Sequence, residues 1–164
     1  MTMGETPKPP LKAEPAGAVR RHRVEHPVDA FAARRSAMDL AGELGFERLA
    51  CLEIAIATSE LASNIAKYGV RGHITLEAID DPRHGPGIVI VASDCGPPFH
   101  DFELAKKDGF DDEGPLSLRW VVDRHGLGAG LGAVTRFTDE LGWEPTAEGK
   151  RVRAVRYLAR PTQE

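Results

Sequence analysis

The stretch Ile88-Val-Ile-Val-Ala92 constrains the fold more than any other part of the chain. Five apolar residues in a row, four of them β-branched, are typical of a strand that is covered on both faces or lies in the centre of its sheet. A strand with one solvated face would alternate between apolar and polar residues instead. The stretch therefore predicts a buried strand that delivers Asp94 at its end, where polar groups collect.

Other patterns predict the elements around this strand. Helical spacing of apolar residues predicts helices at 30–44, 47–68 and 131–141, the first with an apolar face of Phe31, Met38, Ala41 and Leu44. Strand patterns occur at 19–25, 73–79 and 152–158. We also expect a hairpin loop at 80–87, a short helix at 102–107 and a long loop at 108–125.

The order of these elements decides the fold class. A strand, two helices, two strands, a long loop, a helix and further strands give too few β-α-β crossovers for a doubly wound sheet. We expect an α+β protein, a two-layer sandwich whose helices pack on one face of a mixed, mostly antiparallel sheet. The 164 residues suit a single domain at 18–160, after a flexible Pro-rich tail at 1–17.

Composition and charge argue against several classes of partner. The formal net charge is −4 and the basic residues are scattered, so we expect no nucleic-acid partner. No segment has the about 18 consecutive apolar residues of a membrane span, and residues 1–10 lack the apolar core of a signal peptide. Cys51 and Cys95 lack the spacing of a zinc site or a disulfide framework. We therefore expect a cytoplasmic protein without membrane contact.

The helix expected at 47–68 carries Glu60-Leu-Ala-Ser-Asn64, which places a carboxylate and a carboxamide one turn apart on the same face. A polar stripe on an amphipathic helix is most often its solvated side. The pair becomes a candidate site only together with two further stretches, Asp94-Cys-Gly96 and the glycines between 126 and 132.

Glycines alternate at Gly126, Gly128, Gly130 and Gly132, where the third helix begins. Their backbone N–H groups can converge on an anion at the positive end of that helix, and phosphate is the expected guest. The spacing matches neither the dinucleotide-binding pattern nor the P-loop. A glycine-rich loop without a ligand is the alternative.

Asp94 also has two interpretations. A carboxylate after a strand, with Gly96 two residues further on, commonly caps a turn. At the floor of a pocket it would accept a hydrogen bond from an exocyclic amino group, such as that of adenine.

Taken in order, Glu60-x-x-x-Asn64, Asp94-x-Gly96 and the glycines at 126–132 resemble the N, G1 and G2 boxes of the GHKL ATPase/kinase superfamily. Residues 59–68 and 126–141 are similar to the anti-sigma regulatory serine/threonine kinases of the RsbT/RsbW type, most closely to the RsbT-type switch kinase of bacterial stress modules. The resemblance covers residues 19–158. It implies the Bergerat-type ATP-binding fold, with ATP and Mg²⁺ as cofactors.

Matched position by position, the resemblance implies that Asn64 binds the Mg²⁺ that bridges the ATP phosphates and that Glu60 is the general base. It implies that Asp94, supported by Gly96, contacts the adenine amino group. The amides of the glycine cluster would contact phosphate in a lid, at Gly126, Gly128, Gly130 and Gly132. Phosphoryl transfer requires such a convergence of metal, backbone donors and base.

Three features depart from the family's pattern. Pro98 replaces the second glycine of a D-x-G-x-G box and stiffens the loop after the strand. The stretch 109–126 is longer than expected in the RsbT-type kinases. Lys150-Arg-Val replaces a G-T-x-V pattern, so a threonine contact near adenine is missing.

The resemblance implies a serine/threonine kinase of a partner-switching pathway that phosphorylates a STAS-domain antagonist protein and acts with a downstream sigma-pathway regulator. The alternative is an ATP-binding anti-sigma or switch module that sequesters a protein partner without turnover. The presence of Glu60 favours chemistry. A third interpretation, the ATP-binding half of a sensor histidine kinase, lacks an upstream helix with a phospho-accepting histidine.

Overall fold

The computed structural model describes residues 15–107, 110–111, 114–115 and 130–162. Their elements are β1 (Pro15–Val24), α1 (Asp29–Glu43), α2 (Arg48–Tyr68), β2 (Gly72–Asp81), β3 (Gly85–Asp94), α3 (Phe102–Ala105), β4 (Phe110–Asp111), β5 (Gly114–Pro115), α5 (Leu131–Phe137), β6 (Glu140–Pro145) and β7 (Lys150–Tyr157). The predicted order of the main strands and helices is confirmed. Most of the expected long loop at 108–125 lies outside the described residues.

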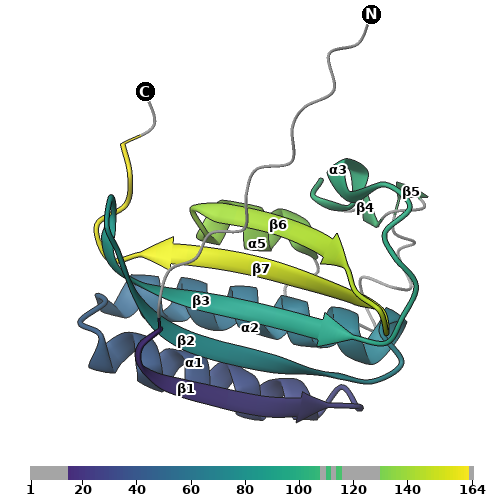
Figure 1. Cartoon of the computed structure of the whole chain (residues 1–164), viewed down its shortest axis with the longest axis horizontal. Coiled ribbons are helices and arrows are strands. Elements are labelled where there is room, and N and C mark those ends of the chain that lie inside the picture. Colours follow the sequence, from purple (N-terminus) through teal and green to yellow (C-terminus); the bar gives the residue numbers. More distant parts are fainter. Residues whose placement is uncertain (1–14, 108–109, 112–113, 116–129, 163–164) are drawn as a thin grey trace, which may run out of the picture.

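Five strands form one sheet in the order β1-β2-β3-β7-β6, as Figure 1 shows. All neighbouring pairs in this sheet are antiparallel, so the α+β expectation is confirmed without a parallel pair. The last strand of the sequence, β7, lies between the central strand β3 and the edge strand β6. The small pair β4 and β5 lies with α3 beyond the end of β3.

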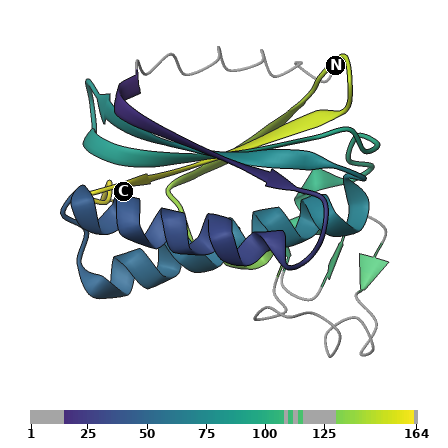
Figure 2. The ribbon, with the colours of Figure 1, turned by 90° about the horizontal axis from the view of Figure 1, so that it is seen from below.

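The helices cover one face of the sheet, as the side view in Figure 2 shows. Ile88, Ile90 and Ala92 of β3 join the main core with α1 and α2. Val89 points to the opposite face, where it joins a second cluster with Val155 and Tyr157. The continuous apolar run is therefore explained by the central place of β3 in the sheet, with one face fully covered by the helices and the other partly buried at Val89 and Val91.

The apolar face predicted for α1 is correct for Ala41, which is buried, and for Leu44, which packs against the core, but it is wrong for Phe31 and Met38. Phe31 is 58% exposed and Met38 is 36% exposed. The buried face is built mainly from small residues instead: Ala30, Ala33, Ala37, Leu40 and Ala41. These recur at spacings of three and four residues as helical packing requires, and alanines let the helix axis lie close to its neighbours.

The hairpin loop predicted at 80–87 is also too long. β2 continues to Asp81 and β3 begins at Gly85, which leaves three residues for the turn. The Asp81 carboxylate accepts hydrogen bonds from the backbone N–H groups of Arg83 and His84 at 2.8 and 2.9 Å. Gly85 has φ 75°, which a residue with a side chain rarely adopts. The tight turn comes from this local chemistry.

The helix predicted at 131–141 ends at Phe137. Thr138 is extended, and the Asp139 N–H donates to the Val155 carbonyl at 2.7 Å. Glu140 then starts β6, which pairs with β7 along its whole length. Strand pairing with β7 therefore overrides the helical pattern of 138–141.

Among the described residues, α2 is long and apolar enough to cross a membrane by length and composition. Half of its most apolar window is buried inside the protein. It packs against α1, α5 and the sheet. This burial is typical of the core helix of a folded domain.

Candidate active site

The middle of α2 presents Glu60 and Asn64 four residues apart, on one face of the helix. Glu60 is only 3% exposed, whereas Asn64 is half-buried. A carboxylate is rarely buried to this extent on the solvated side of a helix. Glu60 therefore belongs to the interior between α2 and its neighbours, and Asn64, one turn further along the helix, is partly exposed.

Asp94 ends β3 on the helix-facing side of the sheet, and it is buried. Its Oδ1 accepts a hydrogen bond from the Gly96 N–H at 2.8 Å. The same oxygen accepts from Lys150 Nζ at 2.9 Å, in an ion pair that is 92% or more buried at both side chains. The turn-capping interpretation of Asp94 is correct, and the ammonium is an additional partner.

Four glycines pack closely around Asp94. A Cβ at Gly69 would lie 2.6 Å from the Asp94 Cβ, and one at Gly149 would lie 2.0 Å from the Asp94 carbonyl oxygen. Hypothetical Cβ atoms at Gly72 and Gly96 would come within 3.0 and 3.2 Å of the Asp94 side chain. Because Gly69 is the C-cap of α2, the helix that carries Glu60 and Asn64 ends directly against this aspartate.

The glycine cluster is described only from Gly130 onward. Gly130 has φ 57° and precedes the first residue of α5, and Gly132 is buried in its first turn. Since α5 packs against α2, these glycines lie on the side of the sheet where the polar pair is found. Gly126 and Gly128 lie outside the described residues, and their phosphate contacts stay predictions.

Sequence reasoning missed Lys150, Gly69, Gly72 and Gly149 as members of this region. In the sequence Lys150 stands out as a departure from the family's pattern, and in the structure it lies directly opposite Asp94 in the β3–β7 register. No local signal could reveal this, because the pair is 56 residues apart in the sequence. The two glycines that flank strands could have been flagged as positions where another backbone approaches closely.

The donor chemistry around α2 suits a magnesium ion that arrives with a nucleotide. Within the part of the chain that the structure describes, no group of three His, Cys, Asp or Glu side chains could hold a metal ion. Mg²⁺ in phosphate sites typically uses one or two protein oxygens and completes its shell with phosphate and water. The half-buried Asn64 carboxamide offers one hard oxygen of this kind.

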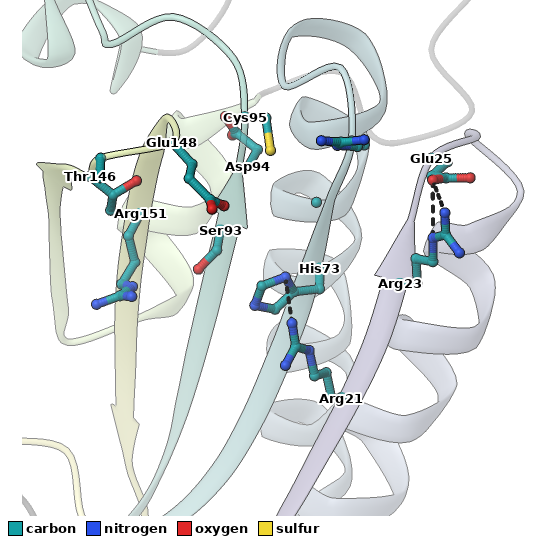
Figure 3. Close-up of a pocket in the computed structure, with 13 residues that line it drawn as sticks. Arg21, Arg23, Glu25, His73, Ser93, Asp94, Cys95, Thr146, Glu148 and Arg151 are labelled. Carbon is teal, nitrogen blue, oxygen red and sulfur yellow. Dashed lines mark hydrogen bonds and ion pairs between the residues drawn. The ribbon is translucent and has the colours of Figure 1, made fainter.

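A separate cavity of about 710 Å³ lies on the opposite face of the sheet, shown in Figure 3. Arg21, His73, Ser93 and Arg151 are among its lining residues. Burial and the charges of Arg21 and Arg151 lower the pKa of His73 below its usual value. Asp94 also lines this cavity, whereas Glu60 and Asn64 do not, so the cavity meets the candidate site only at the end of β3.

Comparison with known proteins agrees with this arrangement. The family described as histidine kinase-like ATPase domain matches residues 25–156, which include all of the candidate site residues. The protein is also similar to "Serine/threonine-protein kinase RsbT" of Bacillus subtilis (strain 168), with 37% identity over 131 residues, 79% of this chain and 90% of that relative. The chain therefore belongs to the histidine kinase-like ATPase (GHKL) family and, within it, to the RsbT-type serine/threonine kinases.

Proposed function

We propose that this protein binds Mg²⁺·ATP on the helix-facing side of the sheet and phosphorylates a serine or threonine of a STAS-domain antagonist protein in a cytoplasmic partner-switching pathway. The observation that carries the proposal is the contact of Gly69 with Asp94, which joins the Glu60–Asn64 helix to the aspartate at the end of β3. The family supports the same chemistry. Residues 18–160 act as its single domain, and a sigma-pathway regulator is the downstream partner.

Each residue has a distinct task in this scheme. The Asp94 carboxylate accepts a hydrogen bond from the adenine amino group, and the Asn64 oxygen holds Mg²⁺, which neutralises phosphate charge when bound. Glu60 accepts the proton of the serine or threonine hydroxyl while the oxygen of that hydroxyl forms a bond to the γ-phosphorus. The bond from that phosphorus to the β–γ bridging oxygen breaks, and ADP leaves. Backbone amides from Gly126 to Gly132 contact phosphate, with Gly96 supporting Asp94.

A second candidate is an anti-sigma or switch module that binds ATP and sequesters its partner without turnover. One observation favours it. Lys150 already pairs with one oxygen of Asp94, so this part of the site is held together without a nucleotide. Both candidates use Asn64 and Asp94 for binding, and they differ in whether Glu60 performs chemistry.

Incubation of the purified protein with γ-labelled ATP, Mg²⁺ and the STAS-domain protein encoded by a neighbouring gene tests the proposal. We expect label on a serine or threonine of that protein, and none when EDTA removes the metal. Stoichiometric complex formation and ATP binding without labelled product would support the sequestering module instead. Failure of the folded protein to bind ATP at all would contradict both.

A further inference from the structure

Lys150 and Asp94 form the most deeply buried ion pair among the described residues, with side chains 8% and 5% exposed. They lie directly opposite each other on the antiparallel strands β7 and β3. The register of the sheet fixes such cross-strand partners, with Cβ atoms about 4.5–5.5 Å apart. The two charged groups are therefore held side by side by the central strands of the sheet.

The pair retains unused hydrogen-bonding capacity. Both donors to Asp94, the Gly96 N–H and Lys150 Nζ, bind Oδ1. No described residue donates to Oδ2. The Lys150 ammonium has three N–H bonds, and within the described residues its only polar acceptor is Asp94; its other close contact is the Phe99 ring, 5.4 Å from Nζ.

Unused groups of this kind are costly when they are buried. Removing two charges from water is compensated only when the remaining lone pairs and protons also find partners. A planar ligand that presents a donor next to an acceptor would satisfy Oδ2 and a second ammonium proton together. This requirement selects ligands by the order of the donor and the acceptor along one edge of the ring. A ligand with the reverse order would place an acceptor against the carboxylate and a donor against the ammonium.

We propose that Lys150 is a specificity-determining residue that donates a hydrogen bond to the N1 atom of adenine while Asp94 accepts one from the neighbouring amino group. This inference rests on the proposed ATP site. Adenine carries its donor at position 6 and its acceptor at position 1. Guanine and hypoxanthine reverse both, so they would place a carbonyl against the carboxylate and an N–H against the ammonium. Lys150 thus adds a second mismatched contact with guanine or hypoxanthine to the one that Asp94 alone would provide.

Arg156 supplies the matched comparison, because it also lies on the helix-facing side of β7 and is buried in an ion pair, with Glu53 at 2.9 Å. Its Nη1 donates to the Phe137 carbonyl as well, at 2.9 Å. Arg156 therefore joins β7 to α2 and to the end of α5. Replacement of either cation costs stability, but only Lys150 is placed to alter the choice of base.

The first experiment needs no mutation. Calorimetry on the full chain with Mg²⁺ compares ATP with 1-deaza-ATP, which lacks the N1 acceptor, and with 7-deaza-ATP, which is altered on the other ring. Loss of one hydrogen bond from a charged donor should weaken 1-deaza-ATP about 10-fold to 100-fold. 7-Deaza-ATP should bind within about threefold of ATP, because the N7 atom that it lacks takes no part in the proposed contacts with Asp94 and Lys150. Equal affinity for ATP and 1-deaza-ATP would overturn the role of Lys150 and leave the ATP site intact.

The second experiment uses Lys150→Met with Arg156→Met as its control. In Lys150→Met, ATP and 1-deaza-ATP should bind with the same affinity, and the preference for ATP over ITP should narrow by about 10-fold or more. Arg156→Met should keep both wild-type ratios. If Lys150→Met keeps the ratios too, Lys150 serves only to stabilise the fold. If the folded wild type binds none of these nucleotides, the proposed function itself fails, and the inference fails with it.

Discussion

Lys150 and Arg156 lie six residues apart on β7, both on the helix-facing side and both paired with a carboxylate at 2.9 Å. At the Arg156 end, the partners come from several elements: Arg156 also binds the Phe137 carbonyl, and Tyr157 binds Asp139 and Glu140. Burial, followed by the hydrogen bond to Glu140, raises the pKa of Tyr157. This network joins β7 to α2, α5 and β6.

At the Lys150 end, the neighbours are glycines and the Phe99 ring. Gly69, Gly72, Gly96 and Gly149 bring backbone against Asp94 and leave one carboxylate oxygen without a donor among the described residues. Each end keeps an unpaired polar group among the described residues, since Arg156 Nε is also buried without a hydrogen-bond partner. At the Lys150 end the unpaired groups are a carboxylate oxygen and ammonium protons side by side, which one ligand edge could bind together. Two ion pairs of equal length on one strand thus serve different ends, and the length alone does not distinguish them.

The largest expected effect comes from comparing two glutamates of α2, Glu60 as the proposed general base and Glu53 as the ion-pair partner of Arg156. Glu60→Gln keeps the size of the side chain but removes the basic oxygen, so phosphoryl transfer should fall by about 10²–10⁴ while ATP affinity stays within a few-fold. Glu53→Gln, the matched change at the Arg156 end, should lower stability and leave transfer per folded molecule unchanged. Single-turnover assays with the STAS partner measure both. Undiminished transfer by Glu60→Gln would remove its role and leave the kinase standing.

The next effect concerns the metal. Asn64→Ala removes the proposed oxygen ligand, so the affinity for ATP in Mg²⁺ should fall about 10-fold to 100-fold. In EDTA the variant and the wild type should bind ATP alike, because no ion is then present to distinguish them. Calorimetry under both conditions checks this. Equal Mg·ATP affinity in the two proteins would end the assignment of Asn64.

A pair of glycine substitutions tests the packing at the Lys150 end. Gly69→Ala would place a Cβ 2.6 Å from Asp94, and we expect it to lower the free energy of unfolding by about 1–3 kcal/mol and to weaken ATP binding. Gly42→Ala lies in α1, where nothing approaches within 4 Å, and should raise stability by about 0.5–1 kcal/mol. Denaturant titration compares them. Equal stability of the two variants would show that the end of α2 adjusts freely.

The smallest effect is on the pH dependence of stability, and it comes from His73 in the cavity on the other face of the sheet. Because burial and the charges of Arg21 and Arg151 lower the pKa of His73 from 6.5, the unfolded chain takes up this proton before the folded one does. The free energy of unfolding should therefore decrease as pH falls from above 6.5 toward the lowered pKa. His73→Gln should flatten part of this slope, and Arg21→Gln should reduce it by raising the pKa. Denaturant midpoints across about pH 5 to 7.5 give the measurement; a slope unchanged in both variants would contradict it.

The sequence revealed most of the fold because its local signals agree with the tertiary structure. The apolar run at 88–92 predicts a buried strand on its own, and the structure shows why each alternate residue is apolar. For α1 the apolar pattern is only partly informative, because Ala41 and Leu44 contact the core whereas Phe31 and Met38 are exposed, and small alanines form most of the buried face. The helical prediction for 138–141 is wrong for another reason, since the pairing of Glu140 and Leu141 with β7 cannot be recognised from the local sequence.

In the candidate site, too, some relations between residues could be predicted from the sequence and others could not. Glu60 and Asn64 could be predicted as neighbours because one helix carries both. The contact of Asp94 with Lys150 depends on the order of the strands and on their register, and neither follows from local patterns. The close approach of four glycines to Asp94 likewise depends on the assembled sheet.

The position of β7 beside the central strand has a consequence for synthesis on the ribosome. β3 leaves the ribosome well before β7, because 56 residues separate Asp94 from Lys150. At about 5–20 residues per second, β3 remains an edge strand for roughly 3–11 s. An apolar edge of this kind is a template for pairing with other chains. The nascent protein therefore exposes an apolar strand edge until β7 is available, and a chain truncated before residue 150 would keep that edge exposed.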